Sequence, residues 1–271
     1  MNIRAVRRAF GPFFAFCLVY FAMACSTAVA EESVSEKTMS AVRNCKEHFR
    51  IFIDVGHYRK APGATSARGK TEFDFNLLLA KTLEVTLVKK GYSQIKLFVS
   101  DGGSQSLRMR VRESQKFKAD IFISIHHDDV QSRYKSTWIF EQKKRLYSDE
   151  FKGYSLFISK LNPAWPESLR FATLVADEFL RRGMTFTRHH AEQIEGEGRQ
   201  LLDENRGIYQ YDELIVLKEN ASPAVLIEAG VIINRDEELI LGTPARRELF
   251  SEAVSEAVQN FCVTKLVTDQ Q

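Results

Sequence analysis

The chain has 271 residues, of which 44% are hydrophobic and 27% are charged, with 38 lysines and arginines against 35 aspartates and glutamates. Its first 30 residues hold three arginines and no acidic residue, so the remainder carries 35 of each. This neutral remainder argues against nucleic-acid binding, and its length suits one domain with a sizeable core.

The first 30 residues have the layout of a secretory signal peptide. The three arginines precede an apolar stretch from Phe10 to Ala24, and an A-x-A sequence ends at Ala30. Because a membrane span needs about 20 apolar residues, we expect cleavage after Ala30 and no stable membrane span afterwards. The exported protein would then reside in the periplasm or cell envelope. An uncleaved anchor, a lipoprotein signal at Cys25 and a twin-arginine signal are the alternatives.

Two cysteines, Cys45 and Cys262, remain once the signal is removed. Exported proteins mature in oxidising compartments, so we expect one disulfide that joins the two ends of the domain. Two unpaired cysteines that act as small hydrophobic residues are the alternative.

Apolar strand patterns alternate with helical patterns through the first half of the chain. A polar lead-in helix is expected over residues 34–47. It is followed by strands at Arg50–Asp54, Ile95–Ser100 and Asp120–His126, and by helices at Glu72–Lys90 and Leu107–Lys118.

The second half predicts strands at Ser136–Phe140 and Tyr154–Ser159, a helix at Glu167–Arg182 and a terminal helix at Pro244–Leu266. Residues 188–206 are polar and indicate a long loop or a poorly packed helical insertion. Two apolar runs, Glu213–Leu217 and Ala224–Gly230, are expected to close the sheet. The alternation predicts an α/β fold, with helices on both faces of a mostly parallel sheet.

Such folds place their functional sites beyond the carboxyl ends of the strands. His57 follows the first strand, His126 ends the third, and Glu228 ends the apolar run AVLIE. Glu72 begins the first long helix and reaches the same edge if the intervening loop folds back. Two imidazoles and a carboxylate with one open position are the ligand set of hydrolytic zinc sites. We therefore predict Zn²⁺ on His57, Glu72 and His126, with Glu228 as general base.

Each of these residues also has a simpler interpretation. A single histidine at a strand end is often a hydrogen-bonded structural residue. Glu72 is a favourable charge in the first turn of a helix. Glu228 is the hardest to explain in this way, because a carboxylate within an apolar strand is costly unless it is paired or functional.

The chain resembles the zinc-dependent N-acetylmuramoyl-L-alanine amidases that remodel bacterial cell walls. The resemblance lies in IFIDVGHYRKAPGATSARGKTEFDFNL, RVRESQKFKADIFISIHHDD and SPAVLIEAGVIINRDEE. It implies the same three zinc ligands, Glu228 as the catalytic carboxylate, and a six-stranded sheet of the phosphorylase/hydrolase-like type. The implied substrate is peptidoglycan, cut at the amide between N-acetylmuramic acid and L-alanine.

The resemblance also bears on neighbouring residues. Asp128 stands where relatives carry Asp or Asn, which implies that it orients His126 or approaches the metal. His127 is expected to point away from the site or to lie behind the ligands. Tyr58 and Arg59 replace two usual glycines, so the floor of the pocket is expected to be bulkier or turned differently.

The organisation we predict is a signal peptide at 1–30, a lead-in segment at 31–48, and a zinc amidase domain at 49–267. A polar insertion lies around residues 187–207. Some relatives carry an insertion that blocks the metal until an activator protein removes it, and its histidines and glutamates could do the same here. A solvated loop is the simpler alternative. Alternative functions are a zinc peptidase or amidase on soluble muropeptides or another exported amide, and a non-catalytic wall-binding protein.

Overall fold

Seven strands form one sheet in the order β2-β1-β3-β9-β6-β8-β7 in the computed structural model, which describes residues 36–102 and 106–268. β6 is antiparallel to β9, β7 is antiparallel to β8, and the other neighbours are parallel. The strands are Ile51–Val55 (β1), Ile95–Val99 (β2), Ile121–Asp128 (β3), Ser155–Ile158 (β6), Leu201–Asp203 (β7), Ile208–Gln210 (β8) and Ala224–Val231 (β9). The predicted signal peptide and its alternatives lie outside the described residues.

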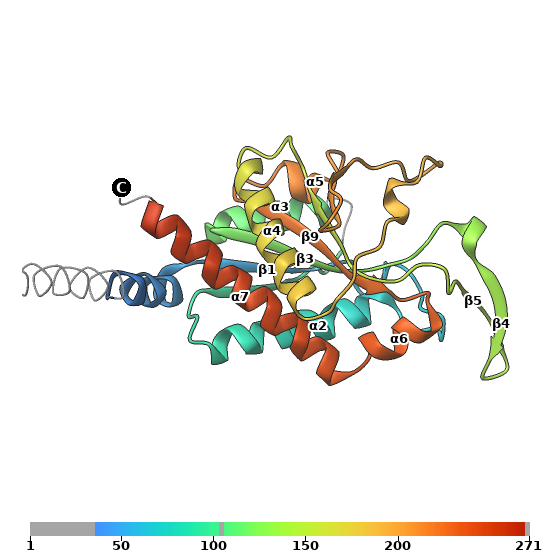
Figure 1. Ribbon diagram of the computed structural model, residues 1–271. Coiled ribbons are helices and arrows are strands. Elements are labelled where there is room, and N and C mark those ends of the chain that lie inside the picture. Colours follow the sequence, from blue (N-terminus) through green and yellow to red (C-terminus); the bar gives the residue numbers. More distant parts are fainter. Residues whose placement is uncertain (1–35, 103–105, 269–271) are drawn as a thin grey trace, which may run out of the picture.

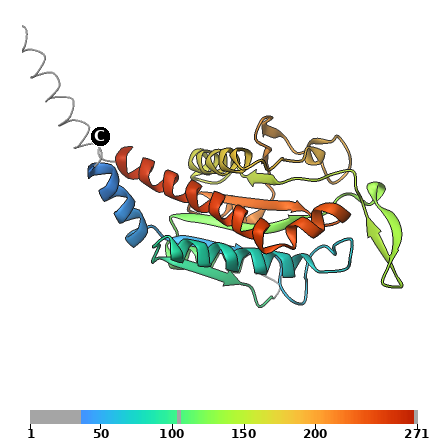
Figure 2. The same ribbon diagram turned by 60° about the horizontal axis from the view of Figure 1, so that its bottom comes forward.

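Helices cover both faces of this sheet (Figure 1). α7 packs between α2 and α4 on one face, as Figure 2 shows, while α3 and α5 pack on the other. The helices are Glu72–Lys89 (α2), Ser106–Phe117 (α3), Trp165–Arg181 (α4), Ile215–Lys218 (α5), Arg235–Leu241 (α6) and Pro244–Thr268 (α7), with 3₁₀ turns at Ser132–Tyr134 and His189–Ala191. No helix in the ranges 36–102 and 106–268 is long and apolar enough to span a membrane.

Alternate side chains of the central strands belong to different cores. Ile121, Ile123 and Ile125 of β3 join the larger core beneath α2, α4 and α7, whereas Phe122 joins the core beneath α3 and α5. β9 follows the same rule, because Val225 and Ile227 face the larger core while Ala224 and Leu226 face the smaller one. This period of two directs His126 and Glu228 to the face that α3 and α5 cover.

Several local predictions need correction. The run Glu213–Leu217 is not a strand, because α5 occupies Ile215–Lys218. β9 does not close the sheet but lies between β3 and β6, and the edges are β2 and β7. The sheet therefore has seven strands instead of six, because the polar region predicted as a loop contributes β7 and β8 follows it.

A separate hairpin forms where one strand and a charged excursion were expected. β4 (Ser136–Phe140) pairs with β5 (Lys143–Tyr147) as a two-stranded antiparallel ribbon outside the main sheet. It projects from the body of the domain in Figure 1.

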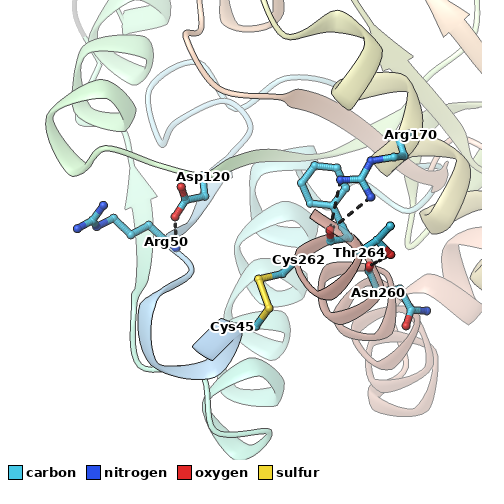
Figure 3. The surroundings of a disulfide bond; sticks show 8 residues. Cys45, Arg50, Asp120, Arg170, Asn260, Cys262 and Thr264 are labelled. Carbon is cyan, nitrogen blue, oxygen red and sulfur yellow. Dashed lines mark hydrogen bonds between the residues drawn. A yellow bond between two sulfur atoms is a disulfide. The ribbon is translucent and has the colours of Figure 1, made fainter. Parts of the chain in front are cut away.

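A disulfide joins the two ends of the domain. Cys45, in the helix over residues 36–48, is bonded to Cys262 of α7 across 217 residues of sequence (Figure 3). Both cysteines are buried. The bond connects the lead-in helix to the terminal helix, which is the pairing that the cysteine content suggested.

Candidate metal centre

Three side chains predicted as metal ligands meet at the carboxyl edge of the sheet. His57 Nε2 lies 2.9 Å from Glu72 Oε2, and His126 Nδ1 lies 3.0 Å from Glu72 Oε1. One ligand atom from each residue lies within 4.8 Å of the other two. β1, α2 and β3 thus bring together residues separated by up to 69 positions in the sequence.

Close packing around this group leaves room only for glycine at two positions. A Cβ added at Gly56 would lie 2.4 Å from His126 Nε2, and one at Gly63 would lie 2.2 Å from Glu72 Oε2. Gly63 also has a φ of +75°, which disfavours other residues. The glycines of the loop after β1 therefore let the backbone approach the imidazoles and the carboxylate directly.

His57 itself has a φ of 62°, an uncommon conformation for a residue with a side chain. Arg110 of α3 stabilises the backbone there, because its guanidinium donates to the carbonyl oxygens of Val55 at 2.5 Å and His57 at 2.6 Å. The same guanidinium donates to Asp54 Oδ1 at 2.5 Å, and both side chains are buried. Arg110 therefore holds the turn that presents His57.

Glu72 is suited to bind a cation. Burial opposes its ionisation, but hydrogen bonds to His126 and His57 outweigh that effect and hold the pKa of Glu72 well below its usual value. Thr71 caps α2 by accepting from the Asp74 N–H, which fixes Glu72 in the first helical turn. The carboxylate therefore stays ionised and in place.

Glu228 lies beside the three residues on the neighbouring strand. It pairs with His126 in the register of β3 and β9, and both side chains belong to the same face. Burial raises the pKa of Glu228 well above the ordinary range, and the carboxylates of Asp128 and Glu72 add to the shift. Its Oε2 is buried and makes no hydrogen bond within the described part of the chain. A carboxyl group of this kind can accept a proton and later release it.

His127 points to the opposite face, as the alternation requires. Its Nδ1 lies 2.8 Å from Asn76 Oδ1, and Asn76 donates to Glu72 Oε1 at 3.1 Å. Asn76 was not singled out from the sequence. Its position one helical turn after Glu72 is the signal that could have identified it.

Asp128 does not hydrogen-bond to His126 in the described structure, which corrects one expectation. β3 continues to Asp128 with a register shift after His126, and Asp128 pairs with Val231. Its carboxylate instead meets His190, whose Nε2 lies 2.8 Å from Asp128 Oδ2. Residues 187–207 are therefore not a simple solvated loop, because His189 and His190 are buried against β3.

None of the acidic or histidine residues of 187–207 joins the group of His57, Glu72 and His126 within the described chain. The insertion lines a neighbouring hollow instead. That hollow, of about 280 Å³, includes His126, Glu228, His190, Glu197 and Arg199 in its wall. A second hollow of about 210 Å³ lies on the other side of His126 and is lined by His57, Tyr58 and Arg110 among others.

The donor set fits a divalent cation. Ligand atoms about 2.0–2.2 Å from a tetrahedral zinc ion are roughly 3.3–3.6 Å apart, so the separations of 2.9 Å and 3.0 Å from the two Glu72 oxygens would need to widen only slightly. Two histidines and one carboxylate would hold a tetrahedral ion with one position left for water or substrate, and the hollows that flank His126 lie next to this group. This arrangement can bind and polarise a substrate beside a proton-accepting carboxyl group.

A family model described as N-acetylmuramoyl-L-alanine amidase matches residues 51–260. The chain belongs to this family. The amidases of this family hydrolyse the amide bond between N-acetylmuramic acid and L-alanine in peptidoglycan, so the predicted enzyme class and activity are confirmed.

Curated relatives of the amidase family cover most of the chain. AmiA of Escherichia coli (strain K12), an N-acetylmuramoyl-L-alanine amidase, is 26% identical over 224 residues, which cover 78% of this chain and 75% of AmiA. The probable amidase AmiB of Haemophilus influenzae is 27% identical over 224 residues, which cover 78% of this chain and 51% of AmiB. This chain thus spans about half the length of some relatives.

Solved amidase structures share the fold. Ami1 from Mycobacterium smegmatis has a TM-score of 0.60 at 17% identity, covering 81% of this chain and 99% of that one. CwlD from Clostridioides difficile, whose structure is in complex with the GerS lipoprotein, has a TM-score of 0.53 at 21% identity. The match covers 79% of this chain and 98% of the CwlD chain. These likenesses confirm the predicted α/β fold with a mostly parallel sheet.

Proposed function

We propose that the chain is an exported, zinc-dependent amidase in which His57, Glu72 and His126 bind the metal and Glu228 moves the proton. The observation that carries this proposal is the convergence of the three side chains, with mutual distances within 4.8 Å, beside a carboxyl group that lacks a hydrogen bond at Oε2 within the described chain. A bound zinc ion would lower the pKa of water to about 7 and polarise the scissile carbonyl.

The protein's own residues then divide the remaining work. Glu228 accepts a proton from the attacking water and delivers it to the nitrogen of the departing L-alanine. Its raised pKa matches both steps, because the group must first be ionised and then give the proton away. Arg110 and Asn76 hold His57 and Glu72 in position.

The hollows on both sides of His126 suit an extended substrate. The scissile amide would lie at His126, with the glycan and the stem peptide extending in opposite directions along the sheet edge. Peptidoglycan has this form, with a sugar chain on one side of the amide and a peptide on the other. We take the polymer in preference to soluble muropeptides as the substrate.

Export and partners complete the proposal. The sequence pattern of the first 30 residues supports export to the periplasm or envelope, where peptidoglycan lies. A bond between Cys45 and Cys262 agrees with an oxidising compartment. The solved complex of CwlD with a lipoprotein supports a search for a protein activator of this amidase.

The test combines metal content with product analysis. Purified protein digests sacculi, and we expect free L-alanine amino ends on intact stem peptides. Glu228→Gln should keep the zinc ion at His57, Glu72 and His126 but lose turnover, whereas His126→Ala should lose that ion and turnover together. Cleavage of soluble muropeptides alone would exclude the polymer as substrate. Parental activity in both variants would refute the assignment of the site.

A further inference from the structure

A second group of metal-competent side chains lies where the insertion meets β3. Asp128, His189 and His190 each offer a ligand atom within 4.8 Å of the other two, and all three side chains are buried. We propose that these residues form a second metal site, for a divalent transition-metal ion such as Zn²⁺, which fixes residues 187–207 to the sheet. This inference does not depend on the proposed catalytic roles.

The distances suit a shared ion. Asp128 Oδ2 lies 2.8 Å from His190 Nε2 and 3.3 Å from His189 Nε2. Ligands about 2.0–2.2 Å from a tetrahedral zinc ion are separated by roughly 3.3–3.6 Å, so shifts of less than about 1 Å would admit the metal. Two imidazoles and a carboxylate also form a donor set that zinc prefers.

His189 provides the observation that an ion pair alone does not explain. Its side chain is 1% exposed, and its Nδ1 is satisfied by Thr187 Oγ1 at 2.8 Å. Its Nε2 faces the Asp128 carboxylate yet makes no hydrogen bond to any described residue. A buried polar atom without a hydrogen bond costs about 1–3 kcal/mol, and a metal ion would use that nitrogen as a ligand.

The surrounding hydrogen bonds orient all three donors. His190 Nδ1 lies 2.9 Å from Glu197 Oε2, and Asp128 Oδ1 accepts the backbone N–H of Asp129 at 2.8 Å. Metal-binding histidines commonly use their second nitrogen in this way, toward a carboxylate or another polar group. The contacts of His189 with Thr187 and of His190 with Glu197 therefore leave both Nε2 atoms directed at Asp128 Oδ2.

The metal would shape the substrate hollow. His189 and His190 belong to the insertion and Asp128 to β3, so one ion would join the two segments directly. The hollow of about 280 Å³ is lined by Asp128 and His190 together with His126 and Glu228. Binding at the second site would hold this wall in place beside the proposed catalytic carboxylate.

Without a metal, the same residues form an ion-pair arrangement. Burial opposes the charged form of His190, but Asp128 and Glu197 outweigh it and raise the pKa of His190 to about 9. A protonated His190 would then bridge the two carboxylates and could not bind zinc through Nε2. The two arrangements predict different metal contents.

The experiment is a zinc titration of the purified full chain after chelator treatment, with metal measured by mass spectrometry and protein by amino-acid analysis. We expect about two zinc ions per wild-type chain, and about one in His57→Ala and in His189→Gln. The double variant should retain none. His48→Gln, at an exposed histidine, is the matched control and should keep the wild-type content.

One zinc ion per wild-type chain, absent in His57→Ala, would overturn the proposal in favour of the ion pair. A second measurement does not depend on the folding of His189→Gln. In His57→Ala, added Zn²⁺ should slow tryptic cleavage at Arg188 and Arg199, which flank the cluster, by at least about tenfold. An unchanged cleavage rate would likewise overturn it.

Discussion

The imidazole of His127 hydrogen-bonds through Nδ1 to the side-chain oxygen of Asn76, 2.8 Å away. The amide nitrogen of Asn76 donates to Gly56 O at 3.2 Å and to Glu72 Oε1 at 3.1 Å. Burial lowers the pKa of His127 to about 3, so the ring is neutral and its Nδ1 carries the donated proton. One buried amide thus connects the ends of β1 and β3 to the proposed ligand on α2.

This connection predicts the effect of removing the amide. Asn76→Leu should weaken zinc binding by about 10–100-fold, because Glu72 loses the hydrogen bond that orients it. The measurement is competition with a chromophoric chelator. Asn260→Leu, at an exposed position of α7, is the control and should bind zinc normally. Wild-type affinity in Asn76→Leu would show that the amide does not position the ligand.

The buried pair of Asp54 and Arg110 predicts a large loss of stability. Arg110→Met should lower the free energy of unfolding by about 3–5 kcal/mol, because the buried Asp54 carboxyl loses its ion-pair partner and keeps only the hydrogen bond from Ser124. Denaturation by urea measures the change. The double variant Asp54→Asn with Arg110→Met should recover part of the loss. If the loss of stability in the double variant equalled the sum of the losses in the two single variants, the two side chains would not stabilise each other and this account would be wrong.

The raised pKa of Glu228 predicts the acid limb of the activity profile. The proposed base works only when ionised, so kcat/KM should fall as the pH falls through the pKa of this group. Because burial raises that pKa, the fall should occur above about pH 4.3, the ordinary value for glutamic acid. Glu228→Gln should lower kcat by about 10²–10⁴-fold at pH values above that pKa, where the wild-type carboxylate is ionised.

Zinc content must be measured at each pH in this experiment, because protonation of the histidine ligands would also end activity. The role of the carboxyl group would be contradicted if kcat/KM fell only at the pH values at which zinc is lost, and if Glu228 variants stayed active.

The meeting of His57, Glu72 and His126 could be predicted from the sequence because it depends on local patterns. Each histidine follows or ends an apolar run that can only be a buried strand, and parallel strands end at one edge. The glycine-rich loop after β1 permits Glu72 to reach that edge. No knowledge of strand order was needed, and the incorrect sheet edges did not affect the prediction.

The parts that were predicted incorrectly depend on distant contacts. The run Glu213–Leu217 is apolar but too short for periodicity to distinguish a strand from a helix, and its packing against α3 decides the outcome. The sequence around His189 and His190 is polar, and this favoured a loop exposed to solvent. Their burial requires Asp128, about 60 residues earlier, which no local pattern indicates.

The disulfide predicts a stability effect without a catalytic one. Cys45 and Cys262 connect the lead-in helix to α7 at the end of the sheet opposite the carboxyl edge, where the proposed metal ligands lie (Figures 2 and 3). The bond restricts the unfolded chain over 217 residues, so Cys45→Ser with Cys262→Ser should lower the free energy of unfolding by about 2–5 kcal/mol. Urea denaturation of the wild type, with and without reductant, and of the double serine variant measures this loss.

Activity per folded molecule should stay near the wild-type value in the double serine variant below its unfolding transition. The reason is that β1, β3 and α2 hold the site through backbone pairing and buried side chains that the sulfur atoms do not touch. Ser255→Ala, at another buried position of α7, is a control for changes within that helix. A double serine variant that is as stable as the wild type but inactive would show that the lead-in helix supports the active site instead of the fold.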